Sequence, residues 1–123
     1  CVKYKPDCAP CYFNRGLSYK ELGDMQKVIR DMDLAINYRP GYADAFRNRG
    51  NAKAMLQDYP GSIADFTTAL GYTPQDTNIL VNRGLSYHFN TNDENACADW
   101  RTAELAGSRK AAGLVRDQCP MDR

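Results

Sequence analysis

The sequence predicts an all-α fold, a right-handed α-solenoid of three helix-turn-helix units followed by a C-terminal capping helix. Three observations predict it. The triplet Asn-Arg-Gly recurs at residues 14–16, 48–50 and 82–84, at an interval of 34 residues. Apolar residues within each copy fall at helical spacing, and no segment requires a strand. A fixed period of about 20–50 residues is typical of solenoids, whose units bury their apolar faces only by stacking.

The composition fits one ordinary globular domain. The chain has 123 residues, of which 43% are hydrophobic and 25% charged, and its net charge is +1. The sixteen basic and fifteen acidic residues are dispersed, so we expect no nucleic acid or anionic lipid as a partner. No apolar run reaches the roughly 18 residues of a membrane span, and the first residues lack the apolar core of a signal peptide. We therefore expect no membrane insertion, and a targeting segment that is absent or already removed.

Two helices fit each 34-residue copy. In the first copy Tyr12, Tyr19 and Leu22 follow a helical spacing, as do Ile63 and Phe66 in the second. The three copies span residues 9–42, 43–76 and 77–108, followed by a capping helix and tail at 109–123. The expected helices lie at about 9–22, 25–38, 43–56, 59–71, 77–89, 93–106 and 109–119.

Residues 1–8 are expected to be the tail of a preceding repeat or a linker. Cys1 and Pro6 fall in register with Ala35 and Pro40, which suggests that the chain is part of something longer. The alternative is that Cys1 is the lipid-bearing first residue of a mature bacterial lipoprotein.

A polar residue in register marks the start of the second helix in each copy. Its side chain can accept amide hydrogens of the first helical turn. These residues are Asp24, Asp58 and Asn92. Pro40 and Pro74 close the first two copies. Ser108 stands where the third proline would fall, and we expect it to cap the final helix.

Small residues recur at matching places in the two helices of each copy. They are Gly16, Gly50 and Gly84 in the first helices, and Ala35, Ala69 and Ala103 in the second. A glycine inside a helix costs about 1 kcal/mol relative to alanine, so three in register indicate that the second helix packs closely there. The large residues that precede the alanines, Met32, Phe66 and Trp100, are predicted to be core.

The arginine of the triplet is predicted to form an ion pair inside each copy. Each arginine precedes an aspartate by 16 residues, and a helical hairpin brings such positions together. The pairs are Arg15 with Asp31, Arg49 with Asp65, and Arg83 with Asp99. The alternative is that the three arginines form a ladder that binds anions.

This pattern resembles the tetratricopeptide repeat (TPR). The period of 34, an aromatic residue and then glycine in the first helix, alanine in the second and proline at the end carry the resemblance, from Ala9 to Ser108. Departures are Arg before the glycine, Lys53 where the other copies have tyrosine, and Ser108 for the last proline. The resemblance implies a concave groove lined by first helices, which receives a peptide or a partner helix.

By register, the resemblance places a set of first-helix residues in this groove. They are Phe13, Asn14, Leu17, Lys20, Glu21, Arg47, Asn48, Asn51, Ala54, Met55, Val81, Asn82, Leu85, His88 and Phe89. In family members that grip a peptide's C-terminal carboxylate, basic residues and asparagines form a clamp. Arg47, Asn51, Asn82 and Arg116 stand at four of those places, whereas Ala112 stands where a lysine would be required. The alternative is that the recurring asparagines bond backbone, either of the solenoid or of any bound peptide.

Five cysteines in a short chain favour an oxidising compartment. Cys97 and Cys119 are equidistant from Ser108, and Cys1 and Cys11 from Pro6, so each pair could be a disulfide between neighbouring antiparallel helices. The segment from Ala96 to Trp100, with the alanine and cysteine that follow it, also resembles closing segments of exported bacterial repeat proteins. A periplasmic or secreted location is therefore favoured.

Cys8 and Cys11 form a Cys-x-x-Cys motif, whose spacing matches that of thioredoxin-like redox sites. Those sites follow a strand in an α/β fold, and no strand is predicted here. A structural zinc site needs four ligands, and no second pair accompanies this one, so no metal or other cofactor is expected.

The sequence therefore predicts a protein–protein interaction module that binds a protein or peptide. No catalytic residues are expected, and the protein is not expected to be an enzyme. Two alternatives remain: a homo-oligomeric scaffold built by repeat stacking, and a thiol-redox protein that uses Cys8 and Cys11.

Overall fold

The structure is a computed structural model that describes residues 8–119, and within this range it contains helices and no strand. The helices are α1 (Ala9–Leu22), α2 (Met25–Tyr38), α3 (Ala43–Met55), α4 (Tyr59–Tyr72), α5 (Thr77–Phe89), α6 (Asp93–Leu105) and α7 (Arg109–Gln118). All seven predicted helices are present, and each boundary lies within one residue of its predicted position. The expectation for residues 1–7 falls outside the described range.

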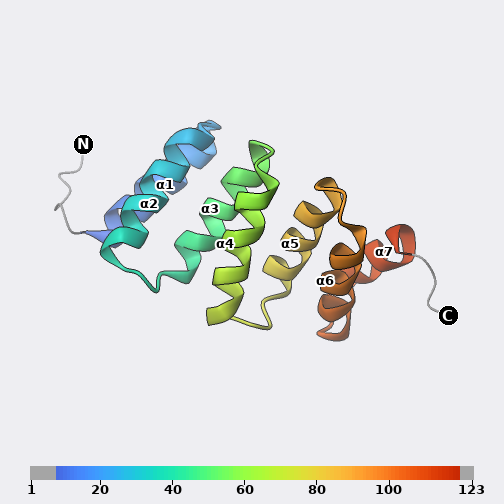
Figure 1. Cartoon of the computed structure of the whole chain (residues 1–123). Coiled ribbons are helices and arrows are strands. Elements are labelled where there is room, and N and C mark those ends of the chain that lie inside the picture. The colour runs from blue at the N-terminus through green and yellow to red at the C-terminus, as the bar shows by residue number, and fades with distance from the viewer. Residues whose placement is uncertain (1–7, 120–123) are drawn as a thin grey trace.

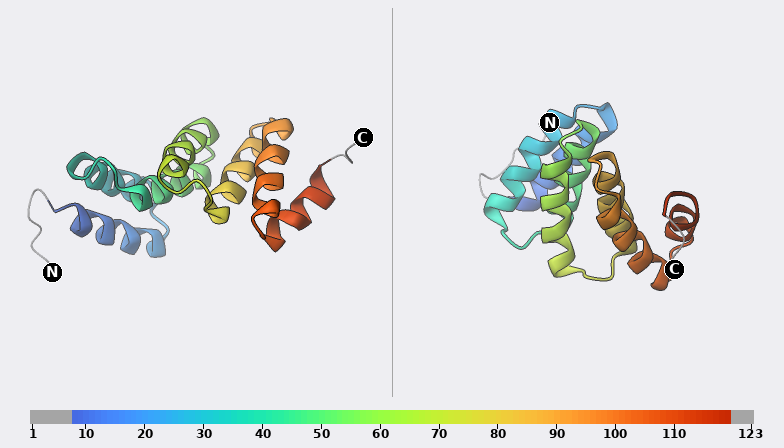
Figure 2. Two further views of the ribbon diagram at one scale, coloured as in Figure 1. Left: turned by 90° about the horizontal axis from the view of Figure 1, so that it is seen from below. Right: turned by 45° about the vertical axis from the view of Figure 1, so that its right-hand side comes forward.

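The helices form a single row of antiparallel pairs. α1 packs on α2, α3 on α4 and α5 on α6, and each pair also contacts the next one along the chain. Figure 1 shows the pairs side by side, with α1 and α7 at opposite ends of the row. The views in Figure 2 show the same row from two further directions. The predicted α-solenoid is confirmed. Within residues 8–119, none of the helices combines the length and the apolar character that crossing a bilayer requires.

Polar side chains cap the helices where the sequence predicts them. Asp24 Oδ1 accepts a hydrogen bond from the amide of Lys27 at 3.2 Å, and Asp58 and Asn92 cap α4 and α6 in the same way. Ser108 Oγ accepts from the Ala111 amide at 3.1 Å, which starts α7. These bonds satisfy amide hydrogens that have no partner within the helix.

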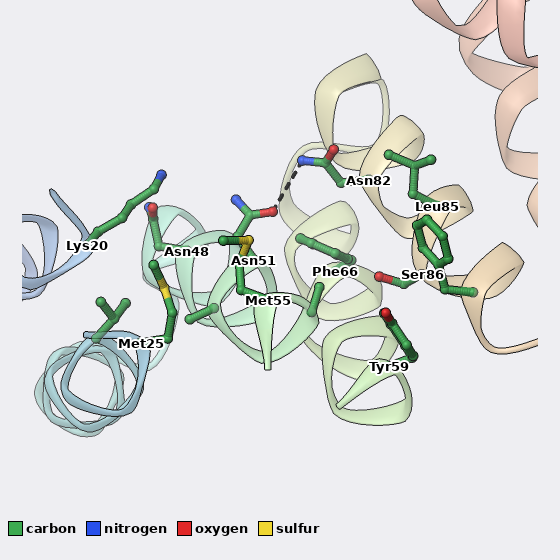
Figure 3. Close-up of a pocket in the computed structure, with 14 residues that line it drawn as sticks. Lys20, Met25, Asn48, Asn51, Met55, Tyr59, Phe66, Asn82, Leu85 and Ser86 are labelled. Carbon is green, nitrogen blue, oxygen red and sulfur yellow. Dashed lines mark hydrogen bonds between the residues drawn. The ribbon is translucent and has the colours of Figure 1, made fainter. Parts of the chain in front are cut away.

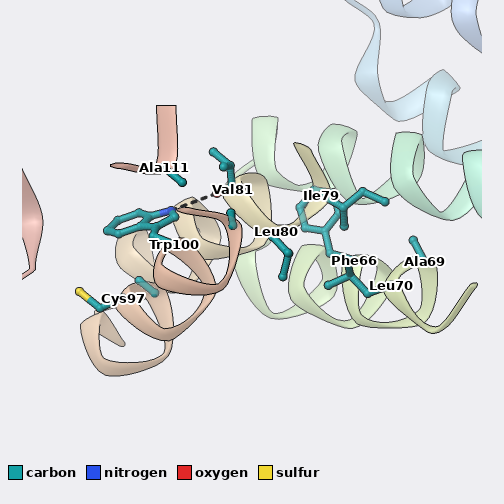
Figure 4. Close-up of a cluster of buried hydrophobic side chains, with 11 residues drawn as sticks. Phe66, Ala69, Leu70, Ile79, Leu80, Val81, Cys97, Trp100 and Ala111 are labelled. Atoms are coloured by element: carbon teal, nitrogen blue, oxygen red, sulfur yellow. Dashed lines mark hydrogen bonds between the residues drawn. The ribbon is translucent and has the colours of Figure 1, made fainter. Parts of the chain in front are cut away.

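The core runs along the seam between first and second helices. Met32, Phe66 and Trp100 are fully buried, as predicted, and each lies against the glycine of its own copy. The alanine series of the second helices is also fully buried. Figure 4 shows the C-terminal part of this core, where Phe66 and Trp100 lie on either side of the α5 residues Ile79, Leu80 and Val81. The small residues therefore set how closely the helices approach.

Within residues 8–119 the structure contains two disulfides, one of which was predicted. Cys97 of α6 is bonded to Cys119, with their Cα atoms 5.8 Å apart, so α7 is fastened to the last repeat. The predicted bond between Cys1 and Cys11 is wrong, because Cys11 is bonded to Cys8. The first turn of α1 brings these two residues to a Cα distance of 5.2 Å, a local pairing that the comparison of neighbouring helices overlooked.

Replacing Cys97 and Cys119 by serine is expected to lower the free energy of unfolding by about 2–3 kcal/mol. The bond closes a loop with a sequence separation of 22, so its loss restores substantial chain entropy to the unfolded state. Urea unfolding followed by circular dichroism measures the change. The matched control replaces Cys8 and Cys11, whose separation is 3, and should have a smaller effect. Equal losses in both variants would contradict the loop argument.

Candidate functional site

A pocket with a volume of about 440 Å³ opens between the first and second pairs and α5. It is lined by Lys20 of α1, Met25 and Val28 of α2, Asn48, Asn51, Ala52, Ala54 and Met55 of α3, Tyr59 and Phe66 of α4, and Asn82, Leu85, Ser86 and Phe89 of α5. Most of these side chains are apolar. Clefts of this size and polarity are typical ligand sites, in which a few polar groups fix the ligand's orientation.

Asparagine side chains form the polar side of the pocket. Asn82 Nδ2 donates a hydrogen bond to Asn51 Oδ1 at 3.2 Å, and this bond joins α5 to α3 (Figure 3). Asn48 is buried, and its Nδ2 donates to the carbonyl of Asp44 at 2.8 Å, so this asparagine bonds the backbone of its own solenoid. The Asn51 amide hydrogens and the Asn82 carbonyl oxygen remain for a ligand. One donor and one acceptor side by side match a peptide group.

The other side of the pocket is apolar and adaptable. Met55 and Phe89 are 68% and 59% exposed, so these two large apolar side chains are accessible to a ligand. The ring of Tyr59 stacks on Phe89 with centroids 5.8 Å apart. Lys20, which is exposed, is the one charged residue among the described residues that line the pocket. The site therefore suits a bulky apolar group, with a cation at its α1 end.

About half of the residues predicted for the groove line this pocket. They are Lys20, Asn48, Asn51, Ala54, Met55, Asn82, Leu85 and Phe89. The others, Phe13, Asn14, Leu17, Glu21, Arg47, Val81, His88 and Arg116, do not.

The residues outside the pocket have other contacts. Phe13 stacks on Tyr42 with centroids 4.9 Å apart. His88 Nδ1 lies 2.6 Å from Asp93 Oδ1, so its ring turns toward α6. The prediction that Val81 lines the groove is wrong, because its side chain is only 4% exposed. Phe13 thus packs at the junction with α3, whereas Asn48 and Asn82, the equivalents of Asn14, line the pocket.

The four clamp residues are not brought together around the pocket. Asn51 and Asn82 meet, as described above. Arg47 Nη2 instead lies 3.4 Å from Asp44 Oδ1 on its own helix, and Arg116 is a highly exposed residue of α7 that pairs with Asp117. The structure brings the two asparagines of the predicted clamp together, but the two arginines do not line the pocket beside them.

Several lining residues escaped the sequence prediction because they lie in second helices. Met25 and Tyr59 occupy the same register position, one residue after the cap of α2 and α4. This position adjoins the end of the preceding first helix, where Met55 lies. Apolar residues in register directly after the helix caps are the signal that could have identified them.

The predicted arginine–aspartate pairs hold the helical hairpins that carry the pocket. Arg15 binds Asp31, Arg49 binds Asp65 and Arg83 binds Asp99, each through two hydrogen bonds of 2.6–2.9 Å. Hydrogen bonds to the carboxylates of Asp65 and Asp99 raise the pKa of Arg49 and Arg83 above the ordinary value of arginine. Because each guanidinium group already donates two hydrogen bonds to an aspartate, the geometry favours ion pairs over an anion-binding ladder.

Arg49 and Arg83 also reach back to the preceding repeat. Arg49 Nη1 donates to Asp33 Oδ1 at 2.7 Å, and Arg83 Nη1 donates to Thr67 Oγ1 at 3.0 Å, at the equivalent register position. Each arginine therefore ties two repeats together. Across residues 8–119, no group of three or more histidine, cysteine or acidic side chains is arranged to hold a metal ion.

No protein-family model and no curated protein sequence matches the chain. Solved structures do match. The first TPR domain of Spaghetti (RPAP3), bound to the HSP90 peptide SRMEEVD, superposes with a TM-score of 0.84 at 17% identity and covers 94% of each chain. The second TPR domain of human RPAP3, in complex with the HSP70 peptide SGPTIEEVD, gives 0.82 at 22% identity, over 88% of this chain and 92% of that one.

The MamA protein gives a TM-score of 0.79 at 16% identity, over 97% of this chain. The matched region spans 63% of MamA. At these identities the likeness establishes the fold, which is that of TPR domains.

Proposed function

We propose that this chain, which has the fold of TPR domains, is a protein–protein interaction module that binds an extended peptide in the pocket between α1, α3 and α5. The Asn51–Asn82 pair at the edge of the apolar pocket carries the proposal. Its free donor and acceptor bond the peptide main chain, while one bulky apolar side chain of the peptide lies between Met55, Tyr59 and Phe89.

Other features support binding rather than catalysis at this site. The pocket is formed on rigid, capped helices, which lowers the entropy cost of binding. Three of the matched TPR structures were solved with bound peptides. We assign the three repeats at 9–42, 43–76 and 77–108 to one binding unit. The two disulfides support a periplasmic or secreted location, because disulfides persist in oxidising compartments.

Alanine at Asn51 or Asn82 is expected to weaken peptide binding about tenfold, because each side chain contributes roughly one hydrogen bond to the peptide main chain. A peptide selected from a displayed random library provides the probe, and fluorescence anisotropy measures its affinity. The control is Asn37→Ala, an exposed asparagine of α2 that does not line the pocket. Selected peptides that bind Asn51→Ala and Leu85→Ser as tightly as the unaltered protein would place the binding site elsewhere.

The same probe distinguishes main-chain recognition from carboxylate recognition. Because Arg47 and Arg116 do not line the pocket, a C-terminally amidated peptide should bind as well as the free acid. A large loss of affinity on amidation would instead support the clamp. Sizing chromatography at two concentrations tests the remaining alternative, assembly of copies by repeat stacking.

A further inference from the structure

The first turn of α1 holds a disulfide that the binding function does not use. Cys8 is the N-cap of the helix and Cys11 lies three residues on, with Ala9 and Pro10 between them. Both cysteines are half-buried, as is Cys119 of the other disulfide, whereas Cys97 is only 3% exposed. The pocket contacts α1 only through Lys20, close to the other end of this helix. The two sites are therefore separate.

The other repeats show that the helix start does not need this bond. Tyr42 and Asp76 occupy the register position of Cys8 in the second and third copies. α3 begins after Tyr42 without any side-chain cap, and α5 begins with an ordinary aspartate cap. Cys8–Cys11 joins two residues of a single turn, whereas Cys97–Cys119 joins two helices. A structural role accounts for the second disulfide but not for the first.

The position of Cys8 stabilises its thiolate, the form that acts as leaving group or nucleophile in thiol–disulfide exchange. Its Sγ accepts the amide hydrogen of Cys11 at 3.2 Å. The positive end of the α1 dipole lies beside it, and the first turn of α1 carries no acidic residue. Thiolates in Cys-x-x-Cys motifs at helix N-termini are stabilised by such surroundings, and the thiolate is the reactive form in exchange.

We propose that Cys8–Cys11 is a thiol–disulfide exchange site that accepts two electrons from a dithiol. One thiolate of the dithiol attacks Cys8 Sγ, forms a mixed disulfide and expels Cys11 as a thiolate, which takes a proton from solvent. The second thiol loses its proton and attacks the dithiol sulfur of the mixed disulfide. Cys8 then leaves as a thiolate held by the Cys11 amide. The dithiol is oxidised to a disulfide, and the Cys8–Cys11 bond is reduced.

A dithiothreitol titration tests this site against the other disulfide in the same chain. The protein carries Cys1→Ser, so that no fifth thiol interferes. After equilibration, free thiols are trapped by alkylation, and mass spectrometry of the digested protein reports each cysteine. Cys8 and Cys11 should be half-reduced at a dithiothreitol concentration at least tenfold below that for Cys97 and Cys119. Oxidised glutathione should restore the bond, and the far-ultraviolet circular dichroism should not change.

Two results would overturn the proposal. One is a Cys8–Cys11 bond as resistant to dithiothreitol as Cys97–Cys119. The other is a loss of helical signal or of melting temperature on its reduction as large as that caused by reducing Cys97–Cys119, which would make it a structural bond.

Insulin reduction by dithiothreitol distinguishes the kind of substrate. If the protein accelerates insulin reduction and Cys8→Ser abolishes the acceleration, protein disulfides are substrates. If insulin is reduced at the rate of dithiothreitol alone while the Cys8–Cys11 bond is still reducible, the exchange is with small dithiols. Asn51→Ala retains the exchange in either case, so failure of this proposal and failure of peptide binding are distinguishable.

Discussion

Asp65→Ala is expected to lower the free energy of unfolding by about 3–5 kcal/mol, the usual cost of removing one partner of a buried ion pair. The Asp65 side chain is 5% exposed and accepts hydrogen bonds from Arg49 Nε at 2.8 Å and Arg49 Nη2 at 2.7 Å. Lys53 Nζ lies 3.2 Å from Asp65 Oδ2. Without the carboxylate, two cations converge on a cavity in the second repeat.

The guanidinium has no route to neutrality in this variant. In the unaltered protein, hydrogen bonds to Asp65 raise the pKa of Arg49. Without them, the ordinary pKa of an arginine still lies far above pH 9. Because the charge persists at every accessible pH, the variant should be destabilised equally at pH 6 and pH 9. Replacing both partners, as in the double variant Arg49→Met with Asp65→Leu, should recover much of the loss, since the unpaired guanidinium is removed and only the partly exposed Lys53 charge remains at the site.

Asp33→Ala is the matched control, because Asp33 binds the same arginine from the preceding repeat. Arg49 Nη1 donates to Asp33 Oδ1 at 2.7 Å, but the Asp33 side chain is 55% exposed. Exposed ion pairs contribute at most about 1 kcal/mol, so this variant should lose no more than that. Urea unfolding compares the two. Similar losses in both variants would show that burial of Asp65 does not set the strength of its pair.

The repeat made the scaffold predictable. A residue type that recurs three times at one position of a helical hairpin indicates the same environment three times. The close approach of the helices at the glycines, the caps and the arginine–aspartate pairs therefore followed from spacing alone. Arg15 and Asp31 are an example, since their separation of 16 recurs in all three copies. Copies of the same sequence pattern fold into the same helical hairpin, so equivalent residues make equivalent contacts, apart from differences in side-chain size.

The pocket was less predictable because it depends on differences between copies. Tyr59 and Met25 share a register position but not a shape, and the pocket forms where Phe89 of the next repeat meets Tyr59. Assigning the groove to first helices alone therefore missed the residues that follow the caps. The Cys-x-x-Cys motif of Cys8 and Cys11 was recognised, but Cys11 was assigned to Cys1 by the comparison of neighbouring helices, because the motif exists in one copy only. A feature that occurs in one copy cannot be predicted by comparing copies.

Gly84→Ala is expected to destabilise the third repeat by about 3 kcal/mol, although alanine is the better helix former. A methyl group at this position would overlap Trp100 Nε1 and lie 2.6 Å from its Cδ1. Trp100 is fully buried, and its Nε1 donates to the Val81 carbonyl at 3.2 Å. The rigid indole cannot bend away, so it must shift as a whole and lose a buried hydrogen bond, which alone costs about 1–3 kcal/mol.

Gly16→Ala provides the matched control at the same register position. A methyl group there would lie 2.7 Å from Met32 Cε, the end of a flexible side chain that can rotate aside. The helix gain of about 1 kcal/mol should offset that adjustment, so we expect a change within about 1 kcal/mol of zero. Trp100 is the chain's one tryptophan, so its emission reports the third repeat during unfolding. Gly84→Ala should shift this transition and Gly16→Ala should not. Equal shifts would mean that the residue facing the glycine does not determine the closeness of the two helices, and that the register argument for the glycines is wrong.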